Sequence, residues 1–218
     1  MHFLLADDHP LFRDAMARLV VSLWPQTDVH QAADAEGVLA LANAHPDADL
    51  LLLDLTMPGA RGFSVLVHLR SQYPALPVLM ISARDDTSTA RRAFDHGAAG
   101  FLSKSAAPEE WKRVIENVLS GEPASLGHFV TTPVVLDEER EIAARIATLT
   151  PAQFRVLNRA ASGLLNKQIA WELGVGEATV KAHMGAVLDK LGATNRTQAV
   201  LMLGQLGLEP PGPIPDED

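Results

Sequence analysis

The 218-residue sequence contains no cysteine, which excludes a disulfide scaffold, a thiol nucleophile and a thiolate zinc site. No apolar run approaches the ~20 residues that a membrane-spanning helix needs. The start, Met1–His2–Phe3, lacks the basic residues and the long apolar core of a signal peptide. We therefore expect a cytoplasmic protein with no membrane partner. At 47% hydrophobic and 21% charged residues, the chain can form one large or two ordinary globular domains.

Positive charge is also scarce, because the net charge is −9, which at first argues against nucleic acid as a partner. The shortage is uneven along the chain. Residues 150–208 hold six basic and three acidic residues, whereas the segments 1–120, 121–149 and 209–218 are each net acidic. A polyanion should therefore meet the protein at residues 150–208.

The first 120 residues alternate short apolar runs with helical stretches. We predict strands at residues 3–6, 29–32, 50–54, 78–82 and 99–102, and helices at about 10–23, 34–44, 63–72, 87–95 and 108–120. Five strand–helix units in this length predict an α/β fold with a five-stranded parallel, doubly wound sheet. No glycine-rich nucleotide loop is present, so dinucleotide binding is unsupported.

Polar side chains stand where these predicted strands end. Asp7 and Asp8 follow the first strand, Asp54 closes the third, and Ser82 and Lys104 end the fourth and fifth. Open α/β sheets place their sites at this edge, so we expect one shared pocket. Carboxylates suit Mg²⁺, and a carboxylate can accept a phosphoryl group that a lysine and a hydroxyl then contact. Any one of these residues alone could be a simple turn cap.

Residues 1–120 resemble the receiver domain of bacterial two-component response regulators. The resemblance rests on Asp7–Asp8, Asp54 followed by Met57–Pro58–Gly59, Ser82–Ala83 and Phe101–Leu102–Ser103–Lys104. It implies that Asp54 is the phosphoacceptor, that Ser82 and Lys104 contact the phosphoryl group, and that Phe101 is a switch aromatic. It also implies a Mg²⁺ site formed by Asp7, Asp8, Asp54 and the backbone carbonyl of Thr56.

The second half is predicted to be helical. Glycines and prolines at 121–136 indicate a linker, a helix is expected at 137–148, and the proline-rich acidic tail 209–218 is expected to be disordered. Within 149–208, the helices 166–173 and 177–191 flank a short glycine turn, which is typical of a helix-turn-helix. Val180, Met184, Val187 and Leu191 should form its buried stripe.

Residues 149–200 resemble the DNA-binding domain of the LuxR/FixJ/NarL class, which implies a four-helix, all-α unit. The pieces that carry the resemblance are Asn166–Ala170, Thr179–His183 and Lys190–Gly192. The expected DNA contacts are Asn166, Lys167, Thr179, Lys181, Ala182, His183, Lys190 and Arg196. Leu165 replaces the usual Ser or Thr cap, so we expect Asn166 to cap that helix.

Trp171 is apolar where its helix should face outward. One interpretation is that it packs on a neighbouring helix. The other is that it forms the surface on which the receiver domain rests in a closed state, in which case Trp171→Gln should raise basal DNA binding.

The sequence predicts a transcription regulator and not an enzyme. A sensor histidine kinase would phosphorylate Asp54, and the regulator would dimerise and bind double-stranded promoter DNA. The resemblance implies that the dimer contact is the fourth and fifth helices and the strand between them, with Arg91, Arg92 and Lys112 available for ion pairs. Two alternatives stay open: a phosphatase or phosphotransferase with an aspartyl-phosphate, and a DNA-binding regulator controlled by a partner protein, independently of phosphorylation.

Overall fold

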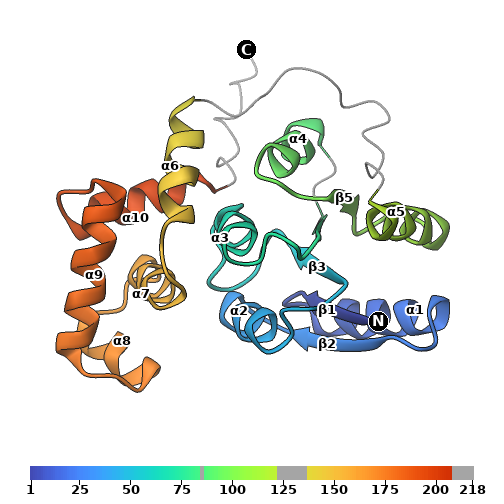
Figure 1. The fold of residues 1–218 in the computed structure, drawn as a ribbon, viewed down its shortest axis with the longest axis horizontal. Coiled ribbons are helices and arrows are strands. Elements are labelled where there is room, and N and C mark those ends of the chain that lie inside the picture. The colour runs from blue at the N-terminus through green and yellow to red at the C-terminus, as the bar shows by residue number, and fades with distance from the viewer. Residues whose placement is uncertain (84–85, 122–136, 208–218) are drawn as a thin grey trace, which may run out of the picture.

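The computed structural model describes residues 1–83, 86–121 and 137–207 (Figure 1). Its N-terminal part is a parallel sheet in the order β2-β1-β3-β4-β5, so the predicted doubly wound fold is confirmed. The strands are β1 His2–Ala6, β2 Asp28–Ala32, β3 Leu50–Asp54, β4 Val78–Ser82 and β5 Gly100–Ser103. The helices are α1 Pro10–Leu23, α2 Ala35–Ala44, α3 Ser64–Gln72, α4 Thr87–Asp95 and α5 Pro108–Ser120. The fifth strand begins one residue later than expected.

The central strand is apolar on both faces because helices cover both sides of the sheet. Leu51 and Leu53 of β3 join the core beneath α2 and α3. Leu50 and Leu52 join the core beneath α1 and α5. The polar end of this strand is therefore held at one edge of a rigid, fully packed sheet.

The C-terminal part is all helical, with α6 Asp137–Ala147, α7 Pro151–Ala161, α8 Asn166–Leu173, α9 Glu177–Leu191 and α10 Arg196–Gln205. Gly174, in the left-handed conformation at φ 65°, ends α8 and allows the tight turn into α9. The predicted stripe Val180, Met184, Val187 and Leu191 is buried. Residues 122–136 of the expected linker, the tail 209–218 and Asp85 lie outside the described residues. No helix in the described part of the chain has the length and apolarity to cross a membrane.

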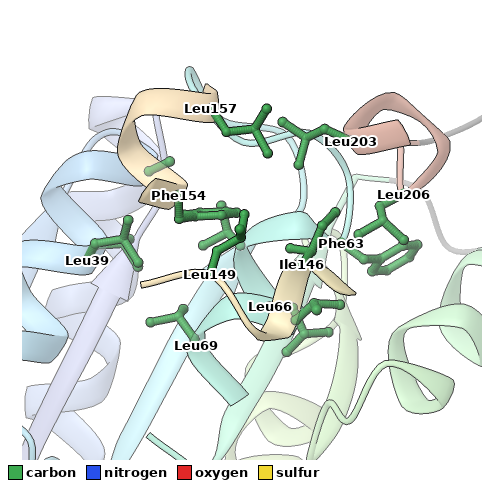
Figure 2. Packing of buried hydrophobic residues seen from close by; sticks show 14 of the residues in the cluster. Leu39, Phe63, Leu66, Leu69, Ile146, Leu149, Phe154, Leu157, Leu203 and Leu206 are labelled. Carbon is green, nitrogen blue, oxygen red and sulfur yellow. The ribbon is translucent and has the colours of Figure 1, made fainter. Parts of the chain in front are cut away.

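The two parts share one hydrophobic core. Figure 2 shows side chains from α3 meeting side chains from α7, α10 and the end of α6. The labelled residues are Leu39, Phe63, Leu66, Leu69, Ile146, Leu149, Phe154, Leu157, Leu203 and Leu206. Because this core continues across both parts, the structure is a closed arrangement in which burial of apolar surface joins the helical part to the sheet.

Polar contacts fix the register of the closed arrangement. The Phe63 amide donates to the Leu206 carbonyl at 2.9 Å. On α4, the Arg92 guanidinium lies 2.7 Å from one carboxylate oxygen of Glu139 on α6, and His96 Nε2 lies 2.8 Å from the same oxygen. These three side chains are nearly buried, so a desolvated ion pair holds α6 against α4.

His68 of α3 lies inside the shared core. Its ring stacks on Phe154 of α7 with centroids 4.1 Å apart and an angle of 7° between the planes. Both ring nitrogens are buried, and no described residue forms a hydrogen bond with either of them. Burial lowers the pKa of His68 to about 4, because the imidazolium would lose its water in this apolar setting.

This histidine should make the fold acid-sensitive. His68 binds its proton near pH 6.5 in the unfolded chain and only near pH 4 in the folded chain. Its contribution to the free energy of unfolding is therefore fully present above pH 6.5 and is lost as the pH falls towards 4. The loss attributable to His68 is about 3 kcal/mol. We expect His68→Leu to flatten the pH dependence of the denaturation midpoint over this range. His183→Gln, a change at a half-buried histidine of α9, is the control, and equal slopes in both variants would contradict the assignment.

Candidate functional site

The acidic residues converge at the carboxyl edge of the sheet, as parallel strands require. Asp7 directly follows β1 and Asp54 ends β3, and these two strands are neighbours in the sheet. Both carboxylates are buried, Asp7 at 0% and Asp54 at 1% exposure. Two neighbouring carboxylates that are both excluded from water require a cation between them.

Lys104, in the loop after β5, supplies that cation in the structure. Its ammonium nitrogen lies 2.6 Å from Asp7 Oδ2 and 2.9 Å from Asp54 Oδ2. The Lys104 amide donates to the Ser82 carbonyl at 2.8 Å, which fixes the loop beside the end of β4. The lysine therefore bridges the two carboxylates.

The pKa values follow from this geometry. Burial raises the pKa of Asp54, while the hydrogen bond and charge of Lys104 act in the opposite direction. Burial acts to lower the pKa of Lys104, but its hydrogen bonds to Asp7 and Asp54 outweigh burial and raise it. The pocket thus stabilises the charged form of Lys104, whereas burial disfavours the charged form of the neighbouring Asp54 carboxylate.

The pocket also fits a hard divalent cation. Donor atoms of Asp7, Asp8, His9 and Asp54 lie within 4.8 Å of one another. Asp54 Oδ1 is buried and has no hydrogen-bond partner of good geometry among the described residues, although the Thr56 backbone acts to lower the pKa of this carboxyl group. This oxygen can therefore take a further ligand. Mg²⁺ prefers oxygen ligands and retains water, which suits two or three carboxylates at a partly open pocket. Thr56, whose carbonyl was expected to complete the set, is exposed two residues beyond Asp54.

His9, the exposed loop residue between β1 and α1, also contacts the acidic pocket. Its Nδ1 lies 2.7 Å from Asp8 Oδ1 and 3.3 Å from Asp7 Oδ1. Its amide also donates to Asp7 Oδ1 at 2.8 Å. Direct adjacency to Asp8 was the signal that could have placed this ring in the pocket.

Ser82 and Phe101 lie next to the acidic pocket on the two last strands. Ser82 is buried at the end of β4 and is paired in register with Ser103 of β5. Phe101, in register with Met80, is half-buried and packs against the core that continues into the helical part. A change at Ser82 can therefore reach the domain interface through one strand.

The second helix of the predicted helix-turn-helix is α9, which we call the recognition helix, and the receiver does not cover it. Lys167, Thr179, Lys181 and Ala182 are all exposed, and His183 is half-buried. Lys181 forms a 3.1 Å ion pair with Glu177 one turn earlier. Small side chains at Ala182 and the exposed Gly185 leave the backbone of α9 open to close approach.

Other expected DNA contacts have partners within the helical part. Lys190 donates to the Thr148 carbonyl at 2.7 Å and to Gln153 at 2.8 Å. Arg196 donates to the Ala160 carbonyl at 3.0 Å and to Asn166 Oδ1 at 3.2 Å. In this structure Arg196 therefore ties α10 to the start of α8.

The expectation that Asn166 caps α8 is wrong. The cap position is Leu165, which has no side chain able to accept a hydrogen bond. The Leu165 amide instead donates to Gln168 Oε1 at 2.7 Å, so the side chain of Gln168, within the first turn, supplies the acceptor for an amide at the start of α8.

Both interpretations of Trp171 are also wrong. Its side chain is 84% exposed, so it neither packs on a neighbouring helix nor forms the surface on which the receiver rests. The closed arrangement uses α6, α7 and α10 instead, which removes the reason to expect an effect of Trp171→Gln on basal DNA binding.

Arg92 was expected to be free for a dimer contact, and this too needs correction. In the closed arrangement it is paired with Glu139 and donates to the Gly207 carbonyl at 3.0 Å. Its guanidinium also lies 5.0 Å from the centre of the Phe63 ring. Glu139 was missed by sequence reasoning, since nothing in its acidic helix indicates a partner 47 residues earlier.

The buried triad of Asp7, Asp54 and Lys104 generates a stability prediction. In Mg²⁺-free buffer at pH 7, we expect Lys104→Met to destabilise the fold by about 3 kcal/mol, because two buried carboxylates lose their cation. Asp54→Asn should instead raise the melting temperature, because it removes a charge that burial disfavours.

The control is Lys112→Met, which removes an exposed lysine 3.8 Å from Glu116 and should change stability by less than about 0.5 kcal/mol. Added Mg²⁺ should restore part of the loss in Lys104→Met. Equal melting temperatures for the two lysine variants would contradict the bridging role.

Comparisons with known proteins agree with this geometry. Residues 3–116 match the response regulator receiver domain family, and residues 147–203 match the bacterial regulatory proteins of the luxR family. The chain is 37% identical over 215 residues to the glycerol metabolism activator of Pseudomonas putida, covering 93% of this chain and 95% of that protein. It is 32% identical over 206 residues to the nitrate/nitrite response regulator protein NarL of Escherichia coli K12, covering 93% and 94%.

Solved structures add the fold. The signal receiver domain of the response regulator NarL from Mycobacterium tuberculosis is 35% identical, with a TM-score of 0.50, and covers 56% of this chain and 97% of that one. An RcsB–DNA complex covers 94% and 98% at 23% identity and a TM-score of 0.50, a likeness of fold alone. The chain therefore belongs to the two-component response regulators with a luxR-family DNA-binding domain, transcription regulators that are controlled through phosphorylation of their receiver.

Proposed function

We propose that Asp54 is the phosphoacceptor, within a receiver domain at residues 1–120 that is joined through residues 121–148 to a DNA-binding domain at 149–208. The observation that carries the proposal is the buried Asp54 carboxylate with one unpartnered oxygen beside Lys104. The phosphoryl donor is the phosphohistidine of a sensor kinase in the cytoplasm, where promoter DNA lies. The protein acts as a switch and not as an enzyme on an external substrate.

The transfer itself needs positioning more than covalent chemistry. An oxygen of Asp54 bonds to phosphorus as the bond from phosphorus to the kinase histidine breaks, and that histidine takes up a proton. Lys104 then pairs with a phosphoryl oxygen instead of bridging Asp7 and Asp54, and Ser82 donates a hydrogen bond to another. Asp8, Asp54 and the Thr56 carbonyl would hold Mg²⁺, with Asp7 beside them, and the ion would neutralise charge between the anions.

The switch reaches the second domain through β5 and α4. Phe101 turns inward as Ser82 moves, and its ring packs against the core that continues beneath α6 and α7. The α4 residues Arg92 and His96 hold Glu139 of α6. Displacement of α4 therefore weakens the contact that keeps the two domains closed.

Phosphorylation then acts on assembly. The recognition helix α9 is exposed in the closed arrangement, so opening is not needed to uncover it. The closed arrangement instead occupies α4, which is part of the surface expected to join two receivers. Two copies joined there place two α9 helices on half-sites about one DNA turn, roughly 10 bp, apart or a multiple of it. Lys167, Thr179 and Lys181 contact the DNA backbone or base edges, and Ala182 permits close approach.

The acceptor is tested by phosphoryl labelling. Incubation with a phosphorylated kinase or a small phosphodonor and Mg²⁺ should label the wild-type chain, and Asp54→Asn should abolish the label because no other carboxylate occupies its position. Asp47→Asn, a change at an exposed aspartate of the loop before β3, should label normally. Persistent labelling of Asp54→Asn would show that the acceptor is another residue.

The closed contact is tested at Glu139. We expect Glu139→Gln to raise dimerisation and affinity for promoter DNA severalfold without phosphorylation, because Arg92 loses its charged partner. Glu138→Gln makes the same charge change one residue away, where the carboxylate accepts a hydrogen bond from Gln205 at 3.2 Å. Sedimentation and fluorescence anisotropy with DNA provide the measurements, and identical behaviour of the two variants would reject the mechanism.

The alternative is control by a partner protein with an inert pocket. Selection of genomic DNA fragments, with and without Mg²⁺ and beryllofluoride, separates the two. Enrichment of a common repeat only in the activated sample supports control through Asp54, whereas equal enrichment in both samples supports the partner-controlled regulator.

A further inference from the structure

Three histidines meet at the edge of the sheet opposite the acidic pocket. His2 begins β1, His30 lies within β2 and His45 caps the end of α2. Strand pairing sets His2 opposite Asp28 and Leu4 opposite His30, so both histidines lie on the sheet face that α2 covers. Five residues of β1, roughly 15 Å, separate His2 from Asp7, and three residues, roughly 10 Å, separate the level of His30 from Asp7.

The three rings are close and their nitrogens are underused. The centroids of His30 and His45 lie 3.8 Å apart, and that of His2 lies 5.9 Å and 6.2 Å from the other two. One nitrogen from each ring falls within 4.8 Å of the others. His2 Nδ1 and His30 Nε2 are buried, and neither has a hydrogen-bond partner among the described residues. Buried polar atoms normally have partners, so these two nitrogens are available to a ligand.

We propose that His2, His30 and His45 form a Zn²⁺ site, with Asp28 or water as the fourth ligand. Neutral imidazole nitrogens in a set of three suit zinc, and a hard ion such as Mg²⁺ would prefer the oxygens of the acidic pocket. The Asp28 carboxylate lies 3.7 Å from His2 Nδ1 and is exposed, so it can turn towards the ion.

Binding would require the rings to move. Tetrahedral zinc with bonds of about 2.0 Å holds its ligand nitrogens about 3.3 Å apart, so the donor atoms would close by about 1.5 Å at most. The rings are stacked, with 16° to 23° between their planes, so side-chain rotation must also turn their nitrogens towards one point. The ion would join β1, β2 and α2, three elements of the receiver that are otherwise held here by backbone pairing and apolar packing.

The test uses the full-length chain without a polyhistidine tag, titrated with Zn²⁺ against a chromogenic chelator. Millimolar Mg²⁺ is present to occupy the acidic pocket. We expect one Zn²⁺ per chain, and at least about 10-fold weaker binding in His30→Gln and His45→Gln, because loss of a direct ligand costs no less than loss of an outer-shell partner. His183→Gln, which removes a histidine of α9, should bind as the wild type does.

Binding that His30→Gln leaves unchanged, or no binding at all, would overturn the proposal. Circular dichroism checks that each variant folds. A second measurement needs no variant: Co²⁺ in place of Zn²⁺ should give the intense visible absorption of a tetrahedral site. The weak spectrum of octahedral Co²⁺ would equally overturn the proposal.

Discussion

The buried negative charge at the carboxyl edge of the sheet is the constraint on which the receiver depends. Asp7 and Asp54 are almost wholly excluded from water, and one ammonium, that of Lys104, serves both. Such an arrangement is stable only while a cation remains between the carboxylates. The proposed phosphoryl group on Asp54 would draw Lys104 away from this position, so the chemistry of the pocket would be coupled to the packing of the loops around it.

The closed arrangement depends on a different kind of interaction. The contact between the domains is mainly apolar, since Phe63, Phe154 and Leu206 belong to one continuous core (Figure 2). Gly62 is needed beside it, because a Cβ there would collide with the carbonyl of Leu206. The Arg92–Glu139 pair adds specificity more than stability, because desolvation offsets most of the attraction between its charges.

Much of the receiver was predictable because each signal is local. A run such as Leu50–Asp54 specifies a buried strand and also places its last residue at the functional edge. The interface was not predictable, because Ile142 and Ile146 show an apolar stripe but not the surface that covers it. The predictions for Trp171 were wrong because a large apolar side chain suggests a packing partner, whereas single apolar side chains are often exposed. The partners of Glu139 and of Arg196 are set by tertiary packing between segments far apart in the sequence.

These constraints together favour control by competition for one surface. If the receiver blocked the recognition helix, activation would have to expose α9, but Lys181 and Ala182 are already exposed. Closure instead occupies α4 through Glu139, so the closed monomer and the proposed dimer joined at α4 would exclude each other. A switch between two such states needs only a few kcal/mol of differential stability. Loss of the Arg92–Glu139 contact and gain of a receiver–receiver contact act in the same direction, so a modest movement of α4 is enough to change the population.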